Sequence, residues 1–249
     1  MSLYVYVKEK KTIQKRVVNY VSYISLTLGS FLLFWAFYPV VSFELYSRLF
    51  IQKQLITPIP SQDGGSPVKL ADSVLGSYSI FSNNLRDFTQ ASLWFPTKPG
   101  SKPTTKLNVK EYLLSIPKLN IDKAKVVVGG EDLTKSLIHY VATSLPGESG
   151  NVVIFGHSTL PQLYNTKNYE TIFTYLPSLE RGDKIAVKVG DVDYEYEVYE
   201  MFVVKPDQVS VLEQDYSSSY LTLVTCVPPG TFWNRLVVKA KLTRLPTEL

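Results

Sequence analysis

The longest apolar stretch of the sequence is VVNYVSYISLTLGSFLLFWAFYPVV, residues 17–41, which runs 25 positions without a charge. A helix needs roughly 20 predominantly apolar residues to cross the hydrocarbon of a bilayer. Trp35, Phe37 and Tyr38 near its far end are typical of a membrane interface. The pattern therefore predicts a transmembrane helix. A cleaved signal peptide is the competing interpretation, but the stretch exceeds a usual signal-peptide core and no small-residue cleavage site follows it cleanly.

The periodicity is lost after this span. Residues 43–55 predict a short helix leaving the membrane. Residues 57–106 contain TPIPSQDGGSP and FPTKPGSKPTTK, whose Pro, Gly, Ser and Thr cannot continue regular structure. Scattered apolar residues lie between these two segments without a clean period. The region is interpreted as a linker or as a lid that covers a groove.

From about residue 108 the pattern is typical of short strands. Val192, Tyr194, Tyr196 and Val198 share one face of a strand over 192–204, with acidic residues on the other face. One short helix is expected over 133–139. The remaining predicted strands are 112–116, 124–128, 152–155, 184–189, 220–226 and 236–242, which together predict an all-β, closed or nearly closed barrel.

The charge of the chain is concentrated at its N-terminus. Five basic residues and one acidic residue before position 17 give +4, which equals the formal net charge of the whole protein. The remainder is balanced and carries no basic stripe, so nucleic acid is not an expected partner. Basic residues just before the span predict a cytoplasmic N-terminus, with everything after residue 41 outside the cell.

The only cysteine, Cys226, ends a predicted strand, and Arg235 opens the next strand after a Pro-Pro-Gly loop. A hairpin returns both residues to the same rim. A thiol beside a permanent cation is a candidate nucleophile with charge stabilisation. The alternative is that Cys226 is a small buried hydrophobe.

Two histidines are present. His157 follows the apolar run VVIFG and lies at a strand end, where it is a candidate acid or base. His139 lies among apolar residues in the predicted short helix and is interpreted as structural. The sequence has no GxSxG, no repeated His/Cys metal pattern, no GxGxxG and no P-loop, so no metal and no cofactor are expected.

Three ordered segments resemble the motifs of the sortases, membrane-anchored cysteine transpeptidases. TLVTC at 222–226, followed by Pro228, Gly230 and NRLVV at 234–238, is similar to the segment around the family's nucleophile. LPGESGNVVIFGH at 145–157 resembles the approach to the family's histidine, and IPKLNI at 116–121 resembles its early strands. The likeness covers roughly residues 110–243.

The resemblance implies an eight-stranded sortase-type β-barrel with short helices, preceded by the transmembrane helix. It implies Cys226 as nucleophile, His157 as general acid and base, Arg235 as a stabiliser of substrate and oxyanion, and Thr225 as a residue lining the substrate groove. Such enzymes cleave an LPxTG-like sorting signal, hold the fragment as a thioester, and transfer it to an amine of a peptidoglycan precursor or a pilin lysine.

The short spacing from Cys226 to Arg235 is closest to class C or class E of that family. The Asp-Pro-aromatic lid motif of class C is absent, although Asp87-Phe88 and Leu93-Trp94-Phe95 occupy the corresponding region. The expected domains are a cytoplasmic tail (1–16), the transmembrane helix (17–41), an extracellular linker or lid (42–107) and the catalytic barrel (108–249). The expected location is the cell membrane, with a single pass.

Two alternative functions remain at this stage. An extracellular cysteine peptidase would use the same cysteine and histidine and release the acyl group to water. A non-catalytic anchored β-domain that binds surface proteins would need neither residue.

Overall fold

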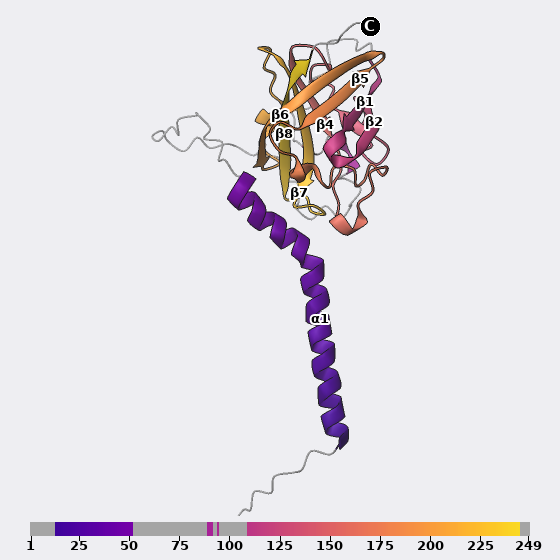
Figure 1. Cartoon of the computed structure of the whole chain (residues 1–249), viewed down its shortest axis with the longest axis vertical. Coiled ribbons are helices and arrows are strands. Elements are labelled where there is room, and N and C mark those ends of the chain that lie inside the picture. Colours follow the sequence, from indigo (N-terminus) through magenta and orange to yellow (C-terminus); the bar gives the residue numbers. More distant parts are fainter. Residues whose placement is uncertain (1–12, 52–88, 92–93, 95–108, 245–249) are drawn as a thin grey trace, which may run out of the picture.

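The computed structural model of the chain describes residues 13–51, 89–91, 94 and 109–244. Most of the predicted linker or lid and the first 12 residues lie outside the described residues. The described part comprises one long helix, α1 (Ile13–Tyr46), and a β-barrel from which it extends (Figure 1). The segment Lys15–Tyr46 of α1 is long and apolar enough to cross a membrane. Only 6% of its most apolar stretch is buried, which distinguishes α1 from the core helix of a globular domain.

The helix α1 runs past the predicted end of the membrane span. The helix expected over 43–55 is helical as far as Ile51, as the end of α1 and the turn that follows it, because no Gly or Pro interrupts the chain between Pro39 and Tyr46; residues 52–55 lie outside the described residues. Pro39 lacks an N–H and crowds the preceding turn, and α1 bends in its C-terminal third, where Pro39 lies (Figure 1). A π-helical turn, η1 (Ser47–Ile51), follows, and Ile51 is buried among apolar residues of the barrel.

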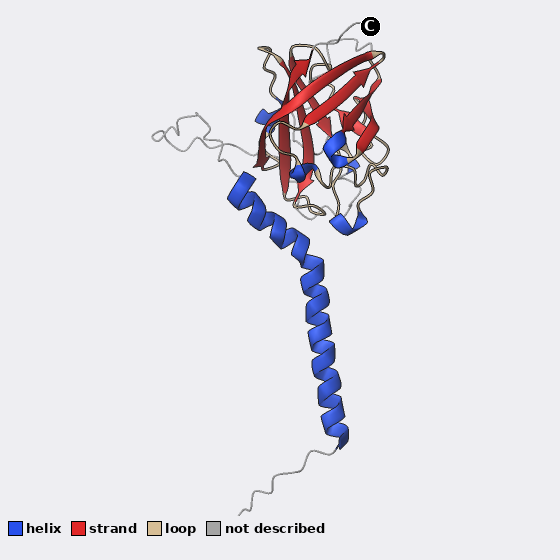
Figure 2. Cartoon of the chain, in the orientation of Figure 1, coloured by secondary structure: helices blue, strands red, loops and turns tan. Residues whose placement is uncertain are grey.

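Eight strands form the wall of a closed barrel, in the order β1-β2-β3-β4-β7-β8-β6-β5, with β5 pairing back to β1. The expected eight-stranded barrel is thus confirmed. Figure 2 shows the strands in red and the short helical turns in blue in the connecting loops. The strands are β1 (Glu111–Ile116), β2 (Ile121–Val128), β3 (Leu137–His139), β4 (Gly150–Phe155), β5 (Lys184–Val189), β6 (Val192–Val204), β7 (Ser219–Val227) and β8 (Asn234–Arg244). The 3₁₀ turns are η4 (Pro117–Leu119), η5 (Pro161–Leu163), η6 (Leu176–Ser178) and η7 (Val209–Leu212).

The helix expected over 133–139 is wrong. The segment forms a turn followed by β3, which pairs in parallel with β2 and antiparallel with β4. A short apolar run such as SLIHY fits a buried strand as well as a helix, so its neighbours in space decide its structure. β3 fills the gap between β2 and β4 and thereby closes the wall.

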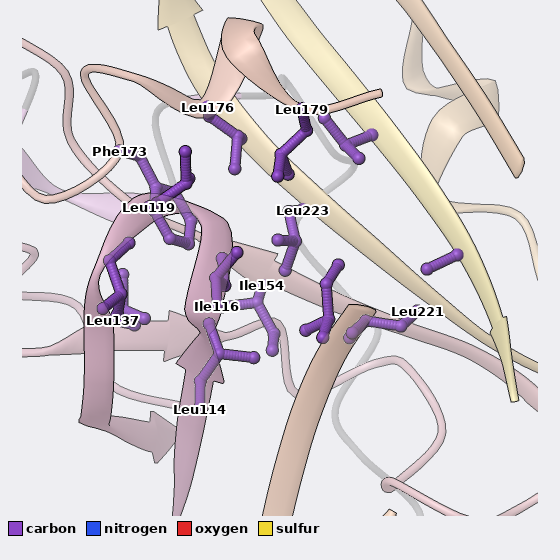
Figure 3. Packing of buried hydrophobic residues seen from close by; sticks show 14 of the residues in the cluster. Leu114, Ile116, Leu119, Leu137, Ile154, Phe173, Leu176, Leu179, Leu221 and Leu223 are labelled. Atoms are coloured by element: carbon purple, nitrogen blue, oxygen red, sulfur yellow. The ribbon is translucent and has the colours of Figure 1, made fainter. Parts of the chain in front are cut away.

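Buried apolar side chains form two clusters, because the two faces of several strands are both covered. The interior cluster is centred on leucine and isoleucine side chains that point toward one another inside the barrel (Figure 3). The outer cluster lies on the other face of β4, β7 and β8. Its core members are Ala91, Trp94, Leu133, Ile138, Val153, Phe155, Phe202, Val204, Val211, Val224, Cys226 and Val237.

A β-bulge in β6 connects the two clusters. The pairing of β6 with β8 shifts between Val198 and Glu200. Before the shift Tyr196 and Val198 belong to the interior cluster, and after it Phe202 and Val204 belong to the outer cluster. Because of the extra residue, the even-numbered side chains of β6 point inward before the bulge and outward after it. The second half of β6 therefore adds apolar side chains to the outer face, where Cys226 lies.

Candidate active site

Strand pairing brings Cys226, Arg235 and His157 to one place. Cys226 pairs directly with Arg235 in the β7–β8 ladder. β4 runs parallel to β7 with Phe155 opposite Val224, so His157, two residues further, lies beside Cys226. The pairing is continued past β4 by the Gly156 N–H, which donates to the Val224 carbonyl at 3.1 Å. The Ser158 hydroxyl donates to the Cys226 carbonyl at 2.6 Å and holds the two chain segments together.

The thiol belongs to the outer face of the barrel wall. Side chains alternate along a strand, and Cys226 shares its face with Val224, while Leu223 and Val227 point to the interior. Cys226 is only 3% exposed, and Val224 and Phe155 belong to the same outer cluster. A substrate would therefore approach along the outside of β4 and β7, over an apolar floor.

Burial shifts the pKa values of Cys226 and His157 in opposite directions. Desolvation raises the pKa of the Cys226 thiol, and the charge of Arg235 opposes that change. Desolvation lowers the pKa of His157, against the opposing influence of Glu170 and Asp132. The resting pair near neutral pH is therefore a neutral thiol and a neutral imidazole.

The Arg235 guanidinium is 3% exposed and is oriented by backbone carbonyls. Its Nη1 donates to the Phe232 carbonyl at 3.0 Å and to the Asn234 carbonyl at 3.2 Å. Within the described part of the chain, Arg235 Nε and His157 Nε2 are buried and have no hydrogen-bond partner. Buried polar atoms normally have partners, so these two are available to a bound substrate.

Trp94 packs against Phe155, His157 and Arg235. Its ring centroid lies 5.6 Å from that of Phe155 and 5.6 Å from that of His157, and the Arg235 guanidinium lies 5.3 Å from the ring. Trp94 is 1% exposed. The preceding residues are attached to the barrel by two backbone bonds, from Ala91 N–H to the Glu131 carbonyl and from Leu133 N–H to the Thr89 carbonyl.

The sequence did not assign Trp94 a role. It lies in a stretch of scattered apolar residues without a period, and the available signal was only its position in the region where a lid was considered. The position of Trp94 against His157 and Arg235 depends on contacts across the fold that no local pattern encodes.

Thr225 and His139 lie apart from this group of side chains. Thr225 is fully buried, and its hydroxyl donates to the Gly156 carbonyl at 2.8 Å, so its visible contact is with the segment that leads to His157. A role of Thr225 in lining the substrate groove stays a prediction. His139 is paired with Ile154 in the wall, and its ring nitrogens contact the Tyr112 hydroxyl (2.8 Å) and the Thr143 hydroxyl (3.2 Å).

No group of three or more His, Cys, Asp or Glu side chains that could hold a metal ion occurs among the residues that the structure describes.

Comparison with known proteins identifies the family. The model of the Sortase domain matches residues 114–243, more than half of the chain. The chain belongs to the sortase family. Sortase D of Bacillus subtilis (strain 168) is 29% identical to it over 133 residues, covering 53% of this chain and 60% of that one. Sortase A of Bacillus anthracis is 30% identical over 132 residues, covering 52% and 58%.

A third relative is sortase SrtE1 of Streptomyces coelicolor, 31% identical over 146 residues, with 52% of this chain and 39% of that one covered. The chain thus spans 60% or less of the length of these relatives. Among solved structures, a Clostridium perfringens sortase D5 transpeptidase is 29% identical with a TM-score of 0.47, covering 54% of this chain and 79% of that one. Sortase C1 from Streptococcus agalactiae is 32% identical with a TM-score of 0.48, covering 57% and 70%.

The curated relatives carry several class labels, D, A and E, and do not single one out. Assignment of this sortase to class C or class E stays a prediction.

Proposed function

We propose that this sortase is a membrane-anchored cysteine transpeptidase in which Cys226 is the nucleophile, His157 the general acid and base, and Arg235 the oxyanion stabiliser. The observation that carries the proposal is the strand register that sets the thiol, the imidazole and the guanidinium beside one another in a sortase domain. The three groups supply what acyl transfer requires.

In the first half-reaction, the Cys226 thiol gives its proton to His157, and Sγ attacks the carbonyl carbon of the scissile peptide bond. The oxyanion accepts a hydrogen bond from the Arg235 guanidinium, whose Nε is buried without a partner among the described residues. The C–N bond then breaks, the leaving amine takes the proton from His157, and the acyl fragment remains on sulfur as a thioester.

In the second half-reaction, an acceptor amine attacks the thioester carbonyl. A C–N bond forms and the C–S bond breaks. The proton released by the amine passes through His157 to the departing thiolate, which restores the neutral pair. Since burial favours the neutral thiol and imidazole, the reactive ion pair is a minor state.

The substrate class that we propose is a protein with an LPxTG-like sorting signal, and the acceptor is an amine of a peptidoglycan precursor or of a pilin lysine. Relatives named as sortases of several classes support a surface-protein substrate, and the apolar floor of the outer cluster suits a peptide of mainly apolar residues.

We further propose that the N-terminus is cytoplasmic and that the barrel lies outside the cell. Protease added to intact cells should then remove the barrel; an intact barrel after such treatment would contradict this orientation.

We propose that the segment around Trp94 acts as a lid. Trp94 covers His157 and stacks with Arg235, so a peptide that reaches these groups must displace the indole. The Asp-Pro-aromatic motif is absent, and here the lid is attached to the barrel by the backbone bonds of residues 89–91.

Product analysis tests the proposed reaction. The full-length enzyme in detergent is incubated with a sorting-signal peptide, with and without oligoglycine, and products are separated by liquid chromatography. A transpeptidase gives the ligated product and consumes peptide faster with the amine. Cys226→Ala should abolish turnover, and Arg235→Lys should lower it strongly because an ammonium lacks the planar donor fork.

Two outcomes would support the alternatives. Hydrolysis products alone, at a rate that the amine does not change, would indicate a cysteine peptidase. No turnover of any peptide, together with substrate-protein binding that Cys226→Ala leaves intact, would indicate a non-catalytic β-domain.

A further inference from the structure

A hollow lies on the outside of the barrel, away from Cys226. It is a cavity of about 390 Å³, and we call it the distal pocket. It is formed by two tyrosines, two lysines and two carboxylates: Tyr199 of β6, Tyr220 of β7, Lys239 and Lys241 of β8, and Glu213 and Asp215 of the loop after η7. Nothing in the proposed reaction uses these residues.

The distal pocket shares a face with the site around Cys226. Along the β7–β8 ladder, Tyr220 pairs with Lys241, and six residues later Cys226 pairs with Arg235. Residues that are an even number of positions apart point to the same side of a strand, so Tyr220 and Cys226 both face outward. Six residues of extended chain span roughly 20 Å at about 3.3 Å per residue. Between the two sites Thr222 and Val224 are fully buried, and Asn151, which accepts from Thr222, also donates to the Val211 carbonyl of η7. A bound peptide that passes from Cys226 over η7 would reach the distal pocket about six residues away from its reacting carbonyl.

The two lysines are placed for an anionic partner. Lys241 Nζ lies 5.9 Å from the Tyr220 ring, and Lys239 Nζ lies 5.8 Å from the ring of Phe202. These contacts hold the ammonium groups at the rim. Within the described part of the chain, neither lysine forms an ion pair, whereas Lys118, Lys184 and Lys188 each do. A carboxylate entering the distal pocket would thus meet two ammonium groups that feel the charge of Asp215 but form no direct ion pair with a described acid.

The opposite wall is fixed before any ligand binds. The Gln214 side chain donates to the Asn151 carbonyl at 3.0 Å and accepts from the Asn151 N–H at 3.0 Å. The Asn151 side chain donates to the Glu213 carbonyl at 3.3 Å and accepts from the Thr222 hydroxyl at 2.7 Å. This network ties the loop to β4 and β7, so the distal pocket is a preformed cavity. The carboxylates of Glu213 and Asp215 on this wall disfavour a polyanion, which leaves a single acidic side chain as the fitting group.

We propose that the distal pocket binds an acidic side chain of the substrate, about six residues before the carbonyl that Cys226 attacks. The inference rests on the proposed transpeptidase function. The acyl fragment stays on the enzyme through both half-reactions, whereas the leaving amine must depart and the acceptor must enter. A fixed cavity with preformed walls suits the fragment that stays.

Peptides that differ in one side chain test the inference. Each peptide carries the same sorting motif, with Glu, Gln or Lys placed in turn from about four to about eight residues before the scissile bond. We expect one position in this range at which the Glu peptide exceeds the Lys peptide roughly fivefold in kcat/KM for thioester formation, as for an exposed charge pair. High salt should reduce the difference because it screens such pairs.

Charge-reversal variants assign the effect to the distal pocket. The double variant Lys239→Glu/Lys241→Glu should prefer the Lys peptide, and Lys239→Gln/Lys241→Gln should show no preference while unfolding at the same temperature as wild type. Lys110→Glu is the matched control, because Lys110 is exposed and precedes β1, and it should keep the wild-type preference. Equal rates for all peptides, a preference that reversal leaves unchanged, or a preference only on the leaving side would each overturn the inference.

Binding measured apart from turnover separates this inference from the function. Fluorescence anisotropy of the same labelled peptides with Cys226→Ala should rank Glu above Gln above Lys. Thioester formation at equal rates with equal binding would refute the distal pocket and leave the proposed function standing. Absent thioester with wild type would refute the function, and the distal pocket would then stand or fall on the ranking in binding.

Discussion

At the scale of single residues, desolvation governs the pKa values of Cys226 and His157, the pair that we propose to react. Burial raises the pKa of Cys226 and lowers that of His157, and Arg235 only partly counteracts the first change. The active ion pair and the neutral pair carry the same number of protons, so their ratio is constant with pH. Activity should therefore fall only where the pair gains a proton below the His157 pKa or loses one above the Cys226 pKa.

The rate at which the Cys226 thiol is alkylated measures its protonation state directly. Because the thiolate is the reactive form and burial raises the pKa of Cys226, the rate of iodoacetamide labelling should rise with pH through a midpoint above the ordinary value of 9.0. Arg235→Gln removes the cation that lowers this pKa, so the midpoint should move higher still. A wild-type midpoint below 9.0 would show that the thiol is activated at rest.

His139 should make the fold sensitive to acid. Burial lowers its pKa to about 4 from 6.5, so the unfolded state binds a proton more readily than the folded state. Stability is therefore full above about pH 6.5 and is lost as the pH falls toward 4, by at most about 3 kcal/mol. Urea unfolding at pH 7 and at pH 4.5 measures the difference, which His139→Gln should reduce. An equal acid loss in that variant would assign the sensitivity to other groups.

At the scale of elements, most strands were predicted from local pattern because alternation and β-branched runs are recorded in the sequence itself. The hairpin geometry alone placed Cys226 opposite Arg235. The placement of His157 next to Cys226 has a different origin, since it depends on the parallel pairing of β4 with β7, two strands far apart in the chain. Local patterns do not encode such a pairing. The strand-end position made His157 a candidate acid or base, and the family resemblance then implied its role with Cys226.

The bulge in β6 and the strand β3 could not be predicted from the sequence pattern. The bulge between Val198 and Glu200 leaves no mark in the alternation, yet it decides that Phe202 faces the outer cluster. The helix expected over 133–139 failed because strand pairing on both sides of β3 outweighs a weak local preference.

The Trp94 segment should control access to the thiol. A desolvated cation–π contact contributes on the order of 2 kcal/mol, so Trp94→Ala should speed alkylation of Cys226 roughly thirtyfold. Trp233→Ala is the matched control, because Trp233 is 62% exposed in the loop before β8. If the two variants label at the same rate, Trp94 does not cover the site.

At the scale of the whole molecule, the anchor and the barrel are in contact. Ile51, just after α1, is 4% exposed within the interior cluster, and Phe43 of α1 packs against the same cluster. These contacts hold the barrel against the C-terminal end of α1, in addition to the covalent connection through the residues that follow η1. Under the proposed orientation, this arrangement keeps the barrel near the outer membrane surface.

The central claim is that Cys226 carries the substrate as a thioester that an amine resolves. Intact-protein mass spectrometry after rapid mixing with a sorting-signal peptide measures this directly. The expected result is a mass increase equal to the acyl fragment on the Cys226 peptide, absent in Cys226→Ala, which disappears faster when oligoglycine is added and yields the ligated product. A chain that turns over peptide without any adduct on Cys226, or an adduct whose decay the amine does not accelerate, would contradict the claim.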